Sequence, residues 1–130
     1  MHSDGYDRAN ILQKVKMATA AVVKGEAAWE RDSVLFHEKT FHFELLTAIL
    51  YVRNQHQAPF DLIDLGGALG SLYNQHQSII DANMVRTWNV IEQSGFVETG
   101  QKEFQNQRLH FYPSIEDCLH ILSPQLMILS

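Results

Sequence analysis

The sequence predicts an α/β protein in which an incomplete parallel sheet of about four strands follows two N-terminal helices. Three observations lead to this prediction. Apolar residues recur at helical spacing in the first 58 residues, short apolar runs alternate with helix-length amphipathic segments after Pro59, and a glycine-rich turn follows the first of those runs. Strands that alternate with helices imply a parallel sheet.

The first helix is expected from Asp7 to Lys24, and Gly25 follows it where helices commonly end in a left-handed residue. Its apolar face consists of Ile11, Val15, Ala18 and Val22. Residues 26–37 have no clean period and are expected to form a connecting segment. A second helix is expected from about Glu38 to His56, before the helix-breaking Pro59.

The part of the chain after Pro59 is expected to form the sheet. Strands are predicted at 60–65, 88–92, 109–112 and 125–129, with a helix between each pair. Ser114 and Asp117 form a plausible capping pair at the start of the last helix. We therefore divide the chain into an N-terminal helical segment, 1–58, and a sheet-containing segment, 59–130.

The composition limits the classes of function. The chain has 130 residues, 45% of them hydrophobic and 19% charged, which fits one folded domain. Its net charge of −5, without a basic cluster, argues against nucleic acid as the main partner. The single Cys118 cannot form an internal disulfide and the N-terminus has no secretion signal, so a cytoplasmic location is expected. The apolar stretch at 43–52 is about half the roughly 20 residues that cross a bilayer, so no membrane span is predicted.

The glycine-rich turn after the first strand is the main candidate for a ligand site. A turn of this kind lets a ligand approach the backbone at a helix N-terminus, which suits nucleotides or carboxylates. The dinucleotide pattern G-x-G-x-x-G, started at Gly66, fits poorly because Ala68 and Ser71 occupy the second and third glycine positions. Nicotinamide binding is therefore a weaker alternative.

Two acidic residues accompany this turn. Asp64 lies two residues before Gly66, and Glu92 lies at the carboxyl end of the second predicted strand. Ligands of parallel α/β sheets bind beyond the carboxyl ends of the strands. We therefore expect Asp64 and Glu92 to flank one crevice with bare backbone between them.

The turn Asp64-Leu65-Gly66-Gly67-Ala68-Leu69-Gly70 resembles the first motif of Rossmann-like S-adenosylmethionine-dependent methyltransferases, with Ala68 in place of the usual middle glycine. Nearly the whole chain resembles a family of such methyltransferases whose substrate is unassigned. The similar stretches are GEAAWERDSVLF (25–36), DLGGALGSLYNQ (64–75), WNVIEQSGFVETGQKEF (88–104), LHFYPSIEDCL (109–119) and QLMILS (125–130).

The resemblance implies a set of cofactor-binding residues. S-adenosylmethionine would bind at the turn, Glu92 would hold the ribose, and the segment from Tyr112 to Ser114 would lie near the adenine. The expected binding residues are Asp64, Gly66, Gly67, Ala68, Gly70, Gln75, Glu92, Tyr112 and Ser114. The substrate stays open as a small molecule or a glycan-type compound.

The resemblance also implies a seven-stranded sheet in the order 3-2-1-4-5-7-6, of which this chain would contain the first four strands. The 125–129 strand would then be an uncovered edge, and we expect either a truncated cofactor-binding half or a homodimer that pairs at this edge. A non-catalytic α/β module, or a degenerate methyltransferase that acts in oligomerisation, is the alternative function.

No residue is assigned to catalysis or to a metal. The seven histidines form no H-E-x-x-H or cysteine–histidine cluster, so no metal site is predicted. Candidates for a general base are supported by their polarity alone. These candidates are Tyr6, His37, Glu38 and His76.

Overall fold

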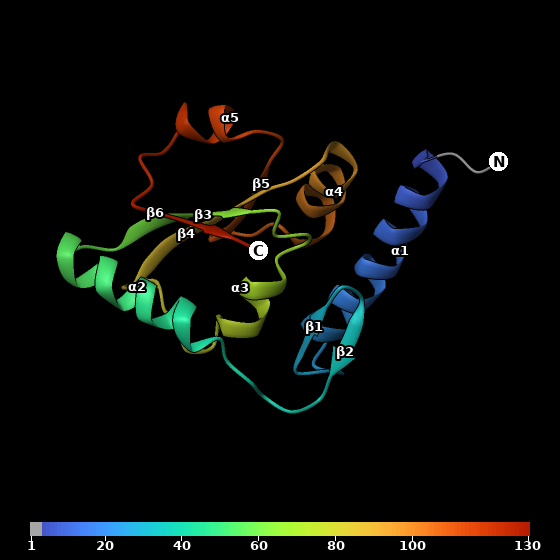
Figure 1. The fold of residues 1–130 in the computed structure, drawn as a ribbon, viewed down its shortest axis with the longest axis horizontal. Helices are drawn as coiled ribbons and strands as arrows, with labels where there is room; N and C mark the ends of the chain where they lie inside the picture. The colour runs from blue at the N-terminus through green and yellow to red at the C-terminus, as the bar shows by residue number, and fades with distance from the viewer. Residues whose placement is uncertain (1–3) are drawn as a thin grey trace.

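The computed structural model describes residues 4–130, with side chains from Asp7 onward. It has an α/β fold with one four-stranded sheet and one two-stranded hairpin (Figure 1). In chain order the elements are α1 (Asp4–Val23), β1 (Trp29–Arg31), β2 (Val34–Phe36), α2 (Phe43–His56), β3 (Phe60–Leu65), α3 (Ser71–His76), β4 (Val85–Ile91), α4 (Ser94–Thr99), the π-helical turn η1 (Gly100–Phe104), β5 (Leu109–Tyr112), α5 (Ile115–Leu119) and β6 (Leu126–Leu129).

The four-stranded sheet is entirely parallel, in the order β5-β4-β3-β6. The α/β class and the parallel sheet are therefore confirmed. The order also agrees with the 3-2-1-4 order expected for the four strands. β4 starts at Val85, before the predicted start at residue 88, and ends at Ile91, so Glu92 lies just beyond the strand.

Helices pack on both faces of the sheet (Figure 1). The larger core contains Leu62, Trp88 and Phe111 from the sheet, together with Ile49 of α2 and Leu72 of α3. These five side chains are 93% or more buried, which removes their apolar surface from water and stabilises this face. A smaller core on the opposite face surrounds Ile63, Ile91 and Cys118 and lies beneath α5. Cys118 is thus a buried core residue.

The segment 26–37 differs from the prediction, because it contains a β-hairpin instead of an irregular connection. β1 and β2 are antiparallel three-residue strands, and the turn between them places Asp32 and Ser33 at φ 51° and 69°. Positive φ at both central residues is typical of the turns that match the twist of a hairpin. Trp29 stacks on Phe36, with ring centroids 4.0 Å apart, on one side of the hairpin.

The two N-terminal helices have shifted boundaries but are both present. α1 begins before Asp7 and ends at Val23, and Gly25 adopts φ 81° just beyond it. α2 begins at Phe43 rather than near Glu38. At the other end of the chain, the Ser114 hydroxyl accepts a hydrogen bond of 3.1 Å from the backbone N–H of Asp117, so the predicted cap of α5 is confirmed.

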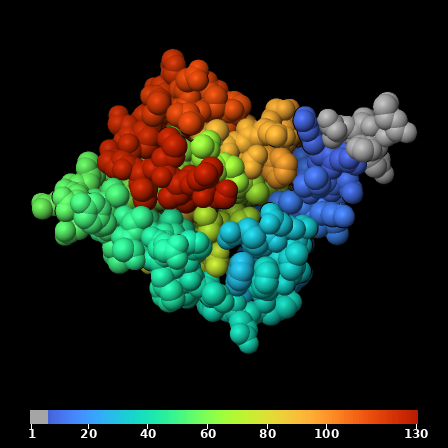
Figure 2. Space-filling model, viewed as in Figure 1, coloured from blue at the N-terminus to red at the C-terminus, as the bar shows by residue number. Residues whose placement is uncertain are grey.

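β6 is at an edge of the sheet and pairs with β3. Its side chains alternate, so Leu126 and Ile128 pack against the larger core while Met127 and Leu129 are 51% and 82% exposed. Figure 2 shows this C-terminal segment at the molecular surface, beside α2. Among the helices within residues 4–130, none is long and apolar enough to cross a membrane.

Candidate functional site

The carboxyl ends of β3 and β4 meet beside the glycine-rich turn. Leu65 and Ile91 are paired in the sheet, and the backbone N–H of Gly66 donates to the Ile91 carbonyl oxygen at 2.9 Å. The turn then reverses through Gly66 at φ 75° and Ala68 at φ 51°. Left-handed φ is easy for glycine and uncommon for alanine, so the turn is held in its shape by its contacts.

Glu92 makes one of those contacts. Its Oε2 accepts a hydrogen bond of 2.9 Å from the backbone N–H of Ala68, and its Oε1 accepts one of 3.1 Å from the N–H of Gln93. A carboxylate has about four acceptor positions. Glu92 can therefore hold the turn and still accept hydrogen bonds from a ligand.

Asp64 lies beneath the turn. Its side chain is completely buried, and its carboxylate accepts a hydrogen bond from the indole Nε1 of Trp88 at 2.9 Å and another from the hydroxyl of Ser130. A Cβ built on Gly67 would meet Oδ2 of Asp64 at 2.5 Å. Burial raises the pKa of Asp64, and the bonds from Ser130 and Trp88 act in the opposite direction. Asp64 is thus placed to support the turn from below.

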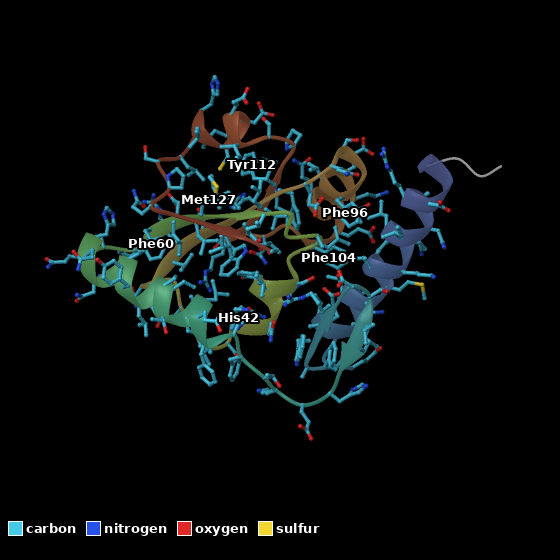
Figure 3. All side chains as sticks on the ribbon, in the orientation of Figure 1. His42, Phe60, Phe96, Phe104, Tyr112 and Met127 are labelled. Carbon is cyan, nitrogen blue, oxygen red and sulfur yellow. The ribbon has the colours of Figure 1, made fainter. Side chains whose placement is uncertain are left out.

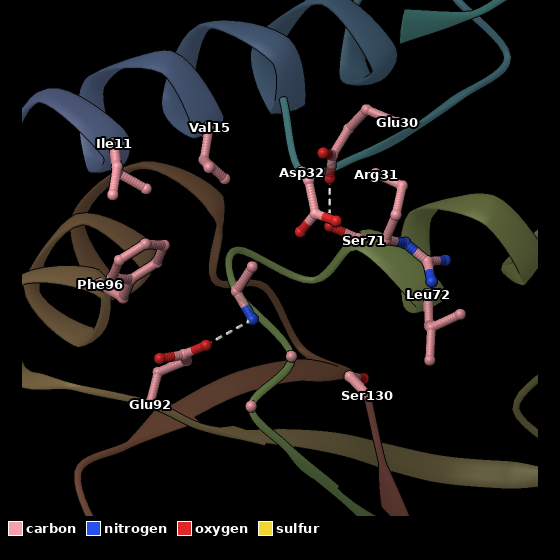
Figure 4. Close-up of a pocket in the computed structure, with 13 residues that line it drawn as sticks. Ile11, Val15, Glu30, Arg31, Asp32, Ser71, Leu72, Glu92, Phe96 and Ser130 are labelled. Carbon is pink, nitrogen blue, oxygen red and sulfur yellow. Dashed lines mark hydrogen bonds between the residues drawn. The ribbon is translucent and has the colours of Figure 1, made fainter. Parts of the chain in front are cut away.

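A cavity of about 230 Å³ opens above the turn (Figure 4). Three carboxylates and one guanidinium border it, so the cavity is acidic. Figure 4 shows Glu30, Asp32 and Arg31 of the hairpin on one side, and Glu92 on the other. The residues that line the cavity are Ile11, Val15, Glu30, Arg31, Asp32, Gly66, Gly67, Ala68, Ser71, Leu72, Glu92, Phe96 and Ser130.

Four of the nine expected cofactor residues border this cavity, namely Gly66, Gly67, Ala68 and Glu92. The other five lie outside its lining and are Asp64, Gly70, Gln75, Tyr112 and Ser114.

Each of these five has a definite place in the fold. Gly70, at φ 92°, packs so closely on Leu109 that a Cβ would lie 3.0 Å from it. Gln75 is buried and bonds to Arg31 and to the Thr40 carbonyl. Tyr112 packs with the smaller core near α5 (Figure 3), and the Ser114 hydroxyl caps that helix as described above.

The hairpin supplies the site residues that the sequence did not suggest. Glu30 points from β1 toward α3 and is 2% exposed. Its Oε1 accepts a hydrogen bond from the Ser71 hydroxyl, while its Oε2 is buried without a hydrogen-bond partner among the described residues. Burial raises the pKa of Glu30, and the Ser71 bond, the Ser33 backbone N–H and the charge of Arg31 oppose that rise.

The side chain of Arg31, like that of Glu30, makes one hydrogen bond to α3 and has one buried atom without a partner among the described residues. Its Nη2 donates to Oε1 of Gln75 at 3.2 Å, and its guanidinium carbon lies 5.9 Å from the centre of the Trp29 ring. Its Nε is buried, and no acceptor for it is found within the part of the chain that the structure describes. Arg31 also borders a second cavity, of about 360 Å³, between α2 and β6. The two cavities share Arg31, Leu72 and Ser130.

The candidates for a general base lie apart from the acidic cavity. His76 is buried, where its Nε2 accepts a 2.8 Å hydrogen bond from the backbone N–H of His42 and its Nδ1 lies 2.8 Å from the Leu72 carbonyl oxygen. Burial lowers the pKa of His76. His37 and Glu38 are exposed, and the side chain of Tyr6 lies outside the described residues. Catalysis therefore stays unassigned.

No group of three or more histidine, cysteine or acidic side chains that could hold a metal ion occurs among the described residues. In comparisons with known proteins, no family model, no curated protein and no solved structure matches this chain.

Proposed function

We propose that this chain is the cofactor-binding part of an S-adenosylmethionine-dependent methyltransferase. The observation that supports this best is the position of Glu92, which holds the Gly66–Ala68 turn and at the same time borders a cavity at the carboxyl ends of adjacent parallel strands. S-adenosylmethionine supplies a methyl group on a positively charged sulfur. The chain's own part is to bind and align that cofactor, which is where such a transfer gains most of its rate.

The charge of the cavity favours this cofactor class over a dinucleotide. A pyrophosphate needs free N–H groups and positive charge at the turn. Here the N–H of Ala68 already donates to the carboxylate of Glu92, and Glu30 and Asp32 add two more acidic groups. Such a lining suits a cationic ligand with hydroxyl donors and repels phosphates.

The size of the cavity sets a condition on the binding mode. Small-molecule sites typically enclose roughly 300–1,000 Å³, and the acidic cavity alone has about 230 Å³. The adjoining cavity of about 360 Å³ shares part of its wall. We infer that a nucleoside ligand with a long side chain extends past Arg31, Leu72 and Ser130 toward this second cavity.

Calorimetric titration of the 130-residue chain with S-adenosylhomocysteine, S-adenosylmethionine and NAD tests the proposal. We expect saturable binding of the first two and none of NAD. Glu92→Gln retains an acceptor for Ala68 but has fewer acceptors for ribose hydroxyls, so we expect about 10- to 100-fold weaker binding. Glu98→Gln is the matched control, because Glu98 is exposed on α4 and does not border the cavity. Equal effects of the two variants would contradict the proposal.

A non-catalytic module that acts in oligomerisation is the second candidate. Two observations favour it: the carboxylate of Asp64 is already satisfied inside the protein, and the β6 edge exposes Met127 and Leu129. Light scattering coupled to size-exclusion chromatography tests this candidate. A dimer that becomes a monomer in Leu129→Lys, together with no binding of either S-adenosyl compound, would favour the module over the enzyme.

A further inference from the structure

Two oppositely charged side chains of the hairpin, at the same cavity, each have one buried atom without a hydrogen-bond partner among the described residues. Glu30 Oε2 and Arg31 Nε are both buried and lack hydrogen-bond partners among the described residues, although both residues border the acidic cavity. Buried polar atoms are nearly always hydrogen-bonded, and leaving one without a partner is destabilising. A ligand that satisfies both atoms would remove this destabilisation.

The hairpin brings these residues to the turn from a distant part of the sequence. In β1 the central Glu30 is buried, whereas Trp29 and Arg31 on either side of it are half-buried. The Glu30 carboxylate reaches Ser71, which follows the glycine-rich turn, and Arg31 reaches Gln75 in the same helix. Figure 4 places both side chains on the wall opposite Glu92.

We propose that Glu30 and Arg31 bind the α-amino-acid end of the cofactor, with Glu30 Oε2 accepting from its ammonium group and Arg31 Nε donating to its carboxylate. An α-amino acid carries one ammonium and one carboxylate on adjacent carbons. Glu30 Oε2 and Arg31 Nε offer one free acceptor and one free donor on adjacent residues. Glu92, on the other wall, is left for the ribose. These roles depend on the proposed function being correct.

This arrangement assigns a direction to the ligand. The nucleoside lies on the Glu92 side, the amino-acid end lies on the hairpin side, and the sulfur lies between them over Gly67 and Ala68. The apolar side chains of Ile11, Val15 and Phe96 border the same cavity from α1 and α4. The second cavity begins at Arg31, next to the amino-acid end.

A pair of ligands isolates the amino-acid end. S-adenosylhomocysteine carries that end, and 5′-methylthioadenosine has the same nucleoside and sulfur without it. We expect the wild-type chain to bind S-adenosylhomocysteine at least 10-fold more tightly than 5′-methylthioadenosine in calorimetry. In Glu30→Gln the amide oxygen can still accept from Ser71, which leaves the N–H₂ group where the free acceptor was. The variant should therefore weaken S-adenosylhomocysteine about 10- to 100-fold and leave 5′-methylthioadenosine unchanged.

Control variants separate the possible failures. Glu38→Gln removes an exposed charge from the segment after the hairpin and should bind both ligands like the wild type. Arg31→Lys, which keeps the charge but lacks Nε, should also weaken only S-adenosylhomocysteine, and it provides the test if Glu30→Gln does not fold by circular dichroism. Equal weakening of both ligands, or no weakening of either, would overturn the roles of Glu30 and Arg31 while leaving the proposed function intact. Failure of the wild type to bind either ligand would overturn the proposed function itself.

Discussion

The buried carboxylate of Asp64 allows a prediction about stability that separates hydrogen bonding from charge. Asp64→Asn keeps one acceptor for the indole N–H of Trp88 and gains an amide N–H₂ group that can donate a hydrogen bond to the Ser130 hydroxyl. Asp64→Leu has a similar length but can satisfy neither partner. The Trp88 side chain is 1% exposed, so its N–H would then have no access to water.

The expected size of the effect follows from that unsatisfied group. Leaving a buried donor without a partner costs about 1–3 kcal/mol, so Asp64→Leu should be less stable than Asp64→Asn by that amount. For a chain of this length this corresponds to a melting temperature roughly 4–11 °C lower. Urea unfolding followed by tryptophan fluorescence measures the difference directly. If the two variants unfold at the same urea concentration, or if the leucine variant is the more stable, Asp64 does not accept the Trp88 hydrogen bond in solution.

The pKa of Asp64 adds a pH dependence with a definite sign. Burial raises this pKa above the ordinary 3.8, so between 3.8 and the raised value the folded chain binds more protons than the unfolded chain. The wild type therefore loses stability as the pH rises through the raised pKa, whereas Asp64→Asn does not titrate. The stability of the asparagine variant relative to the wild type should increase as the pH rises from 3.8 toward the raised pKa. A constant or decreasing difference would contradict the raised pKa.

Two further predictions concern the turn and the helix that follows it. Gly67→Ala places a Cβ 2.5 Å from Oδ2 of Asp64, and the hydrogen bonds of Asp64 hold that carboxylate in place, so we expect the free energy of unfolding to fall by about 1–3 kcal/mol in urea. In the control Gly95→Ala the Cβ would lie 3.4 Å from Leu12, and this variant should lose far less stability. Similar losses in the two variants would argue against a rigid Asp64. Burial lowers the pKa of His76 below 6.5. The stability that its neutral ring contributes is therefore complete above pH 6.5 and is lost as the pH falls toward the lowered pKa. This loss is at most about 1.4 kcal/mol per pH unit. His76→Gln should therefore lose less stability than the wild type between pH 7.5 and pH 5.5, and parallel losses would refute this assignment.

The sheet could be predicted from the sequence because its signals are local. The runs at 60–65 and 109–112 coincide with β3 and β5, since strands buried on one or both faces are rich in apolar residues and are separated by helix-length segments. The glycine-rich turn follows the first of these strands, as expected, and its Gly66 and Gly70 adopt φ 75° and 92°. Because parallel strands end at one edge, Asp64 and Glu92 were expected to flank one crevice. Glu92 borders the cavity beside the turn, whereas Asp64 is buried beneath the turn and does not border it.

The hairpin and its side of the site could not be predicted in this way. Its strands have three residues each, too few for a period, and Asp32 and Ser33 are not the Asn-Gly or Asp-Gly pair that signals a tight hairpin turn. The partners of the key carboxylates are distant in sequence, with Glu30 and Ser71 41 positions apart and Asp64 and Ser130 66 positions apart. Such pairs are determined by tertiary packing, which no local pattern specifies.

The cofactor proposal is tested most directly by recording amide chemical shifts of the ¹⁵N-labelled chain during titration with S-adenosylhomocysteine. We expect saturable shifts that are largest at Gly66, Gly67, Ala68 and Glu92, which border the acidic cavity, and small shifts at His56, which ends α2 near the start of β3 and away from the turn. Absence of saturable shifts, or shifts centred on a surface away from the glycine-rich turn, would contradict the account.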